Sequence, residues 1–201
     1  MVLERKRIVQ YQNPIIKGFY PDPSICRVED TFYLVNSSFQ FLPGVPLFAS
    51  KDLVNWKQIG HCLTKSSQVD MRGVECSMGI FAPTLRFYEG KFYLVTTNIV
   101  KDQGSKYKDD NLPFHMVTKN FILTTDNLEG EWSEPIFIDI NGIDPSLFFE
   151  DGKAYVQYAI FETGIAQVEI DVNTGKLLTE PIIITKGSGG CRGGTSYVSN
   201  R

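Results

Sequence analysis

Three segments of the sequence share one pattern at nearly constant spacing. They read DPSICRVEDTFYLV from Asp22, APTLRFYEGKFYLV from Ala82 and DPSLFFEDGKAYVQ from Asp144, so their starts are 60 and 62 residues apart. Each combines a small or acidic residue, a proline, a Ser or Thr, an apolar run, an acidic tight turn and an aromatic run. Long repeats built from several short strands are typical of propeller blades, which stack around an axis. The sequence therefore predicts about three blades.

The rest of the chain also favours strands. Short runs rich in Val, Ile, Thr, Tyr and Phe alternate with turn signals such as YEGK and EDGK, and no helical stripe of three or more turns appears. SKDLVNWKQIG and EGEWSEPIFI, each with one Trp, are candidates for outer strands. Three unrelated hairpins with similar turns remain an alternative, but the matched Pro-Ser/Thr positions favour a true repeat. We predict an all-β chain.

Asp22 lies between two prolines, Pro21 and Pro23. Proline fixes its own φ and disfavours the helical region for the residue before it, so we expect Asp22 to be extended and stiff. Asp144 occupies the equivalent position in the third repeat. Inner strands of a propeller converge at its axis, so both carboxylates are predicted to face one cavity. A common Asp-Pro-Ser turn is the structural alternative, although two copies at matched positions favour function.

Two converging carboxylates suit general acid–base cleavage of a glycosidic bond. One can activate a water while the other, protonated, donates to the leaving oxygen, and in inverting enzymes acid and base stand ~6.5–9.5 Å apart. Phe39, Phe41 and Phe81 flank the repeats and could provide apolar platforms for sugar rings. Packing between blades is the alternative role for each of them.

Charge and composition argue against several functional classes of protein. The net charge is −3 with no Lys/Arg block, so we expect no nucleic-acid partner, and the longest apolar runs are too short for a membrane span. The N-terminal residues do not read as a secretory signal, which favours a cytoplasmic location. No metal site, cofactor or disulfide is predicted, because the histidines and cysteines lack ligand or C-x-x-C spacing. These residues are His61, His115, Cys26, Cys62, Cys76 and Cys191.

One long stretch resembles the start of family 43 glycoside hydrolases, the β-xylosidase and α-L-arabinofuranosidase group. It reads NPIIKGFYPDPSICRVEDTFYLVNSSFQFLPGVPLFASKDLVNWKQIGHCLT. The resemblance continues through MRGVECSMGIFAPTLRFYEGKFYLVTTN and GIDPSLFFEDGKAYV. It implies a five-bladed β-propeller, of which this chain holds an incomplete N-terminal portion, and hydrolysis with inversion. It also implies Asp22 as general base and Asp144 as the carboxylate that tunes and orients the general acid. Phe39 and Phe81 would line the sugar subsite, Phe81 where many relatives carry the Trp of GIWAP.

The resemblance implies removal of terminal β-1,4-xylosyl residues from xylo-oligosaccharides. An α-L-arabinofuranosidase acting on arabinosylated oligosaccharides is the alternative within the family. A central cation is possible in this family, but no ligand cluster in the sequence argues for one. Two alternatives of another class are a sugar-binding propeller without catalysis and a pseudogene fragment.

The family's general acid is a Glu in a fourth repeat, in a segment like GTGGRxxEAPHxY. This chain has KGSGGCRGGTSYVSNR there, with no Glu after Glu180, which we expect on the surface of an outer strand. The genetic code permits one set of codons for Gly193 to Arg201 that, when read one base later, encodes Glu-Ala-Pro-His-Met-Tyr-Gln-Ile. We therefore interpret residues 1–192 as propeller and 193–201 as a frameshifted tail, and expect the truncated chain to be inactive.

Overall fold

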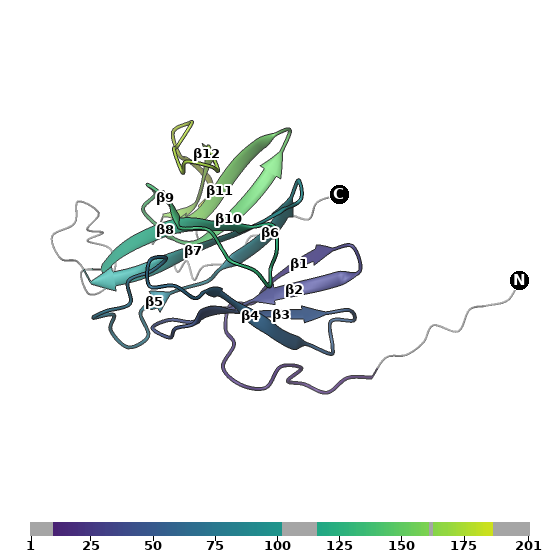
Figure 1. The fold of residues 1–201 in the computed structure, drawn as a ribbon. Coiled ribbons are helices and arrows are strands. Elements are labelled where there is room, and N and C mark those ends of the chain that lie inside the picture. The colour runs from purple at the N-terminus through teal and green to yellow at the C-terminus, as the bar shows by residue number, and fades with distance from the viewer. Residues whose placement is uncertain (1–9, 102–115, 161–162, 187–201) are drawn as a thin grey trace, which may run out of the picture.

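The computed structural model describes residues 10–101, 116–160 and 163–186, and within these ranges the regular structure is entirely β, in three antiparallel sheets (Figure 1). The all-β prediction is confirmed, and each sheet contains one repeat. His115, Cys191 and the predicted tail 193–201 lie outside the described residues.

Each sheet is a blade; in blades 1 and 3 neighbouring strands are consecutive in the sequence, whereas in blade 2 both β5 and β6 pair with β7. Blade 1 contains β1 (Ser24–Val28), β2 (Thr31–Val35), β3 (Gly44–Ser50) and β4 (Lys57–Leu63). Blade 2 contains β5 (Gly79–Ile80), β6 (Thr84–Tyr88), β7 (Lys91–Lys101), β8 (Met116–Thr125) and β9 (Ile136–Ile138). Blade 3 contains β10 (Ile143–Glu150), β11 (Lys153–Ile160), β12 (Gly164–Ile170) and β13 (Ile182–Lys186).

The three repeats form the same hairpin. The turns of β1–β2, β6–β7 and β10–β11 each contain an acidic residue with positive φ: Glu29 at 53°, Glu89 at 47° and Asp151 at 50°. The expected outer strands are present as β4 and β9, although both tryptophans precede them. Trp132 is buried in the core instead. Shared hairpin geometry and strand order support a true repeat over three unrelated hairpins.

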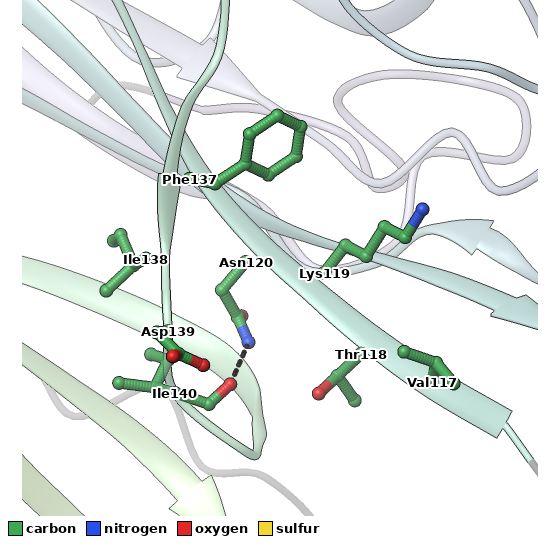
Figure 2. Close-up of a pocket in the computed structure, with 8 residues that line it drawn as sticks. All are labelled: Val117, Thr118, Lys119, Asn120, Phe137, Ile138, Asp139 and Ile140. Atoms are coloured by element: carbon green, nitrogen blue, oxygen red, sulfur yellow. Dashed lines mark hydrogen bonds between the residues drawn. The ribbon is translucent and has the colours of Figure 1, made fainter. Parts of the chain in front are cut away.

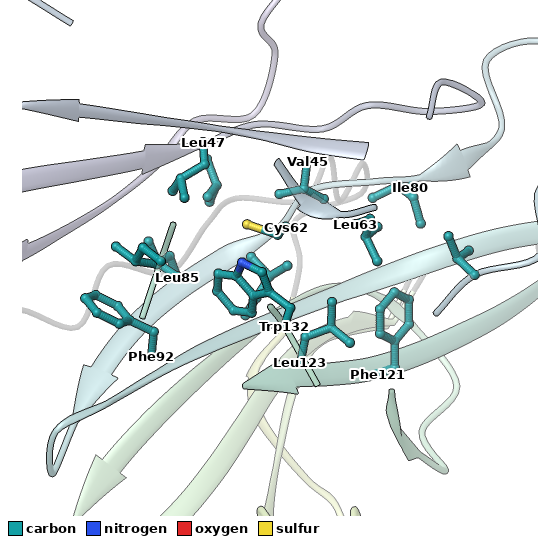
Figure 3. Close-up of a cluster of buried hydrophobic side chains, with 14 residues drawn as sticks. Val45, Leu47, Cys62, Leu63, Ile80, Leu85, Phe92, Phe121, Leu123 and Trp132 are labelled. Atoms are coloured by element: carbon teal, nitrogen blue, oxygen red, sulfur yellow. The ribbon is translucent and has the colours of Figure 1, made fainter. Parts of the chain in front are cut away.

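Two apolar clusters join the blades. The first, between blades 1 and 2, gathers side chains such as Leu47, Leu85, Phe121 and Trp132 (Figure 3). The second, between blades 2 and 3, includes Leu147 and Val156 from blade 3. Alternate strand residues point to these clusters, as expected for sheets packed face to face. Removal of this apolar area from water is the main force that holds the inner strands side by side.

The Ser or Thr of each repeat also links neighbouring blades. Ser24 Oγ accepts a hydrogen bond from the Leu85 N–H at 3.2 Å, and Arg86 Nη2 donates to Ser146 Oγ at 3.1 Å. These side chains are buried, so the bonds are shielded from water. No helix of the described residues is long and apolar enough to span a membrane.

Candidate active site

The inner strands place Asp22 and Asp144 at the same end of blades 1 and 3. Asp22 comes two residues before β1 and Asp144 is the second residue of β10, and both have φ of 53°. The expectation that Asp22 is extended is wrong: its backbone is left-handed, a conformation that Asp tolerates better than most residues. The identical φ values show that both aspartates adopt one blade geometry.

The two carboxylates interact electrostatically. Asp144 is half-buried, and burial raises its pKa from 3.8 to about 6, with the charge of Asp22 as the second cause. Asp22 itself is exposed. The charges of the two groups therefore interact, and their environments differ. One carboxylate lies in solvent and the other is desolvated beside it, an arrangement common at functional sites.

Residues directly after β2 hold the Asp22 loop. Ser37 Oγ donates to Asp22 Oδ2 at 2.5 Å. Asn36 Nδ2 donates to the carbonyls of Tyr20 at 2.8 Å and Pro21 at 3.0 Å, and the Ser37 N–H donates to the same Pro21 carbonyl. Sequence reasoning missed Asn36 and Ser37. The available signal was their position, as polar residues immediately after an apolar inner-hairpin strand.

A different polar chain holds the segment before Asp144. Asn120 in β8 donates to the carbonyls of Ile140 at 3.1 Å and Gly142 at 3.0 Å. Thr97 Oγ1 donates to Asn120 Oδ1 at 2.6 Å and so fixes the orientation of that amide. Asp144 is thus supported by side chains from blade 2 that the sequence analysis did not identify.

The expected aromatic residues lie together. The Phe39 and Phe81 rings meet edge to face with centroids 5.7 Å apart, and Phe19 stacks with Phe39 at 5.9 Å. Backbone hydrogen bonds of 2.9 Å in both directions join Phe39 to Ile80 and fix the row across blades 1 and 2. Phe41 is 61% exposed. Sequence reasoning missed Phe19, which precedes the Pro-flanked aspartate.

A cavity of about 370 Å³ lies next to the row. Its walls include Phe19, Phe39, Phe41, His61 and Ser37, the hydrogen-bond donor to Asp22. A ring nitrogen of His61 is 3.2 Å from Gln58 Nε2, and burial lowers the His61 pKa. No group of three or more His, Cys, Asp or Glu side chains in the described part of the chain is placed to hold a metal ion.

A second cavity, of about 500 Å³, lies between the start of β8 and the segment through β9 (Figure 2). Residues 117–120 and 137–140 line it, and neither aspartate of the pair does. Figure 2 shows the Asn120 side chain reaching across it to the Ile140 carbonyl. This cavity therefore borders the support of Asp144 rather than the carboxylates themselves.

Known proteins resemble this chain over most of its length. Residues 11–198 match the family described as "Glycosyl hydrolases family 43". The chain belongs to this family. It is 41% identical over 186 residues to a xylan 1,3-beta-xylosidase of Vibrio sp, a match that covers 88% of this chain and 33% of the relative. It is 39% identical to the non-reducing end alpha-L-arabinofuranosidase BoGH43B of Bacteroides ovatus, covering 90% of this chain and 32% of the relative.

Solved structures of family 43 enzymes confirm the partial propeller. The xylan beta-1,4-xylosidase of Bacillus halodurans C-125 superposes with a TM-score of 0.78 at 36% identity, and the match covers 90% of this chain and 34% of that chain. This chain thus spans about a third of the length of the relatives it matches. Glu180 is exposed and precedes β13, as expected for a surface position.

Proposed function

We propose that this sequence encodes part of an inverting β-xylosidase that removes terminal β-1,4-xylosyl residues from xylo-oligosaccharides. The observation that carries the proposal is the equivalent placement of Asp22 and Asp144 in blades 1 and 3, both with φ of 53° and with interacting charges, in a family 43 fold. Glycosidases need two carboxyl groups with different protonation behaviour, and the different exposure of these two aspartates supplies a physical basis for it.

Asp22 takes the role of general base. Its carboxylate removes a proton from a water whose oxygen forms a bond to the anomeric carbon, while the bond from that carbon to the leaving oxygen breaks on the opposite face. Asp144 takes the role of the second carboxylate, which tunes and orients the general acid. Phe39 and Phe81 present apolar surface to the sugar ring at this position.

Residues 187–201 stand where the family resemblance places the general-acid motif, and they contain no Glu. These residues therefore supply no proton donor to the leaving oxygen, a contribution that is typically ~10²–10⁴-fold. We propose that residues 193–201 result from a frameshift and that the 201-residue product has negligible activity on natural xylosides. Resequencing the DNA from the Lys186 codon onward tests this. A shifted frame without a Glu-Ala-Pro-His-like stretch would contradict it.

The relatives' names motivate one alternative substrate. They include xylosidases and an arabinofuranosidase, so cleavage of terminal α-L-arabinofuranosyl groups remains the second candidate. Residues 187–201 contain no Glu where the resemblance places the general-acid motif, and this favours a third candidate, a propeller that binds sugar without turnover. Paired assays with aryl β-xyloside and aryl α-arabinofuranoside separate the two hydrolases, and saturable sugar binding without hydrolysis by frame-corrected protein would favour the third.

The Asp22 assignment can be tested with the 201-residue chain itself. A 2,4-dinitrophenyl β-xyloside has a leaving group that needs no protonation, whereas xylobiose needs an acid. The chain should be inactive on xylobiose, but on this activated aryl substrate, which needs no general acid, we expect slow hydrolysis that is lost in Asp22→Ala. Equal rates for the original chain and Asp22→Ala on the aryl substrate would contradict the assignment of Asp22 as base.

A further inference from the structure

We propose that two hydroxyl side chains at equivalent positions of successive blades position the two carboxylates of the site. Ser37 of blade 1 holds Asp22 directly. Thr97 of blade 2 holds the backbone before Asp144 through Asn120. The catalytic meaning of this positioning rests on the proposed function, but the positioning itself is a structural property that can be measured without turnover.

Strand pairing identifies the equivalent positions. The Ser or Thr of the repeat pairs with Val35 in blade 1, Val95 in blade 2 and Gln157 in blade 3. Two positions further along the chain stand Ser37, Thr97 and Ala159. Blades 1 and 2 therefore carry a hydroxyl at this position, and blade 3 carries a methyl group.

The distribution of hydroxyls and carboxylates is complementary. In blade 1 the repeat begins with Asp22, and Ser37 bonds to it within the same blade. In blade 2 the repeat begins with Ala82, so no aspartate stands at the position equivalent to Asp22, and Thr97 donates to Asn120 instead. Blade 3 has Asp144 with Ala159 at the hydroxyl position. The polar chain from blade 2 reaches the segment before Asp144 and supplies the support that Ala159 cannot give.

Because these side chains are buried, each hydrogen bond fixes the orientation of its partner group. Ser37 is 3% exposed, Thr97 is fully buried and Asn120 is 1% exposed, so bulk water cannot replace the protein partners. A buried donor left without an acceptor is costly, and each hydroxyl therefore favours one orientation of its partner. For Asp22 the bond engages Oδ2, which leaves Oδ1 as the oxygen that takes the proton from water in the proposed reaction. For Asp144 two anchored carbonyls fix the chain two and four residues before it.

The first test measures the carboxyl groups directly. In chain labelled with ¹³C-aspartate, Ser37→Ala should shift the Asp22 carboxyl resonance, and Ser37→Thr should restore it. Ser50→Ala is the matched control: Ser50 is also a buried serine of blade 1, and its Oγ donates to Asp52 Oδ1 at 3.0 Å, near the other end of β3 from the loop that carries Ser37. An Asp22 resonance that Ser37→Ala moves no more than Ser50→Ala does would overturn the proposal for Ser37.

The proposed role of Thr97 in positioning Asp144 is tested with a separate variant. Thr97→Val keeps the shape of the side chain and removes its hydroxyl, so the Asn120 amide should lose its fixed orientation. We expect the Asp144 carboxyl resonance to shift in Thr97→Val and to return in Thr97→Ser. An unchanged Asp144 resonance in Thr97→Val would overturn the proposal for Thr97.

The kinetic test separates this proposal from the proposed function. With the 2,4-dinitrophenyl β-xyloside, Ser37→Ala should lower kcat about 10-fold and leave KM nearly unchanged, because misplacement of a catalytic group affects the chemical step. Ser50→Ala should leave both constants unchanged. If Asp22→Ala hydrolyses the aryl substrate as fast as the original chain, the proposed function is contradicted. The carboxyl resonances would still test whether Ser37 and Thr97 position the aspartates. A kcat lost in Asp22→Ala but kept in Ser37→Ala contradicts the positioning alone.

Discussion

Thr84 Oγ1 donates a hydrogen bond to the Pro145 carbonyl at 2.9 Å and so connects the inner strand of blade 2 to the inner strand of blade 3. Pro145 directly follows Asp144, and Thr84 is the Ser/Thr of the second repeat. The bond is buried, with Thr84 2% exposed. The repeated residue that marks the blade in the sequence therefore also fixes the backbone next to one of the paired carboxylates.

Loss of this bond should weaken the contact between blades 2 and 3. We expect Thr84→Val to lower the free energy of unfolding by about 1–2 kcal/mol, because the Pro145 carbonyl loses its donor in a buried place. Thr84→Ser keeps a hydroxyl and should recover most of the loss. Urea denaturation of the three proteins measures the difference, and equal stabilities for Thr84→Val and the original chain would show that the bond contributes nothing.

Stability should depend on pH through Asp144. Its pKa is 3.8 as a free side chain and about 6 in the fold, so the folded state disfavours its ionised form. The stabilising contribution is complete below about pH 4 and is lost as pH rises through 6. Asp144→Asn cannot ionise. We expect it to raise the free energy of unfolding by up to about 3 kcal/mol at pH 8 and by little at pH 4.

Denaturation of Asp144→Asn at both pH values checks this prediction. Asp126→Asn is the matched control, because Asp126 is an exposed aspartate of blade 2. A gain at pH 8 that Asp126→Asn shows equally would point to net charge rather than to burial of Asp144. A gain of the same size at pH 4 would contradict the assigned ionisation.

The sequence was sufficient to predict the blades and the equivalent positions of Asp22 and Asp144 in two of them. Alternating strands and acidic turns are local properties, and the spacing from Asp22 to Asp144 reports the repeat. The conformation of Asp22 was predicted wrongly, because proline preferences describe a local tendency. In the fold, hydrogen bonds from Asn36 to the Tyr20 and Pro21 carbonyls select a left-handed backbone instead.

The supports of the site were not predictable in the same way. Thr97, Asn120 and Gly142 are separated by more than 20 residues at each step, and nothing local marks them as partners. Their connection depends on how blade 2 packs against blade 3. Phe19 joins the aromatic row for a similar reason, since the path of the chain before β1 decides which ring reaches Phe39.

Gly142 should tolerate no side chain. A Cβ added there would lie 2.5 Å from the Ala159 carbonyl oxygen and 2.5 Å from the Tyr158 ring. We expect Gly142→Ala to displace the segment before Asp144 and to lower the free energy of unfolding by about 1–3 kcal/mol, the usual cost of overpacking. Denaturation measures the loss, and the ¹³C carboxyl resonance of Asp144 should shift with it. Original stability and an unmoved resonance together would contradict the close packing described here.

The aromatic row should decide sugar affinity. Phe39 contacts both Phe19 and Phe81, so Phe39→Ala removes the central ring and separates the other two. We expect the Kd for xylose or xylobiose to rise about 3–10-fold, the loss expected for an aromatic contact of about 0.5–1.5 kcal/mol. Phe137→Ala is the control, because Phe137 is 57% exposed and lies at the other cavity. Titration of each protein with sugar, followed by NMR, gives the affinities. Equal weakening by Phe39→Ala and Phe137→Ala would show that the row beside Asp22 is not where the sugar binds.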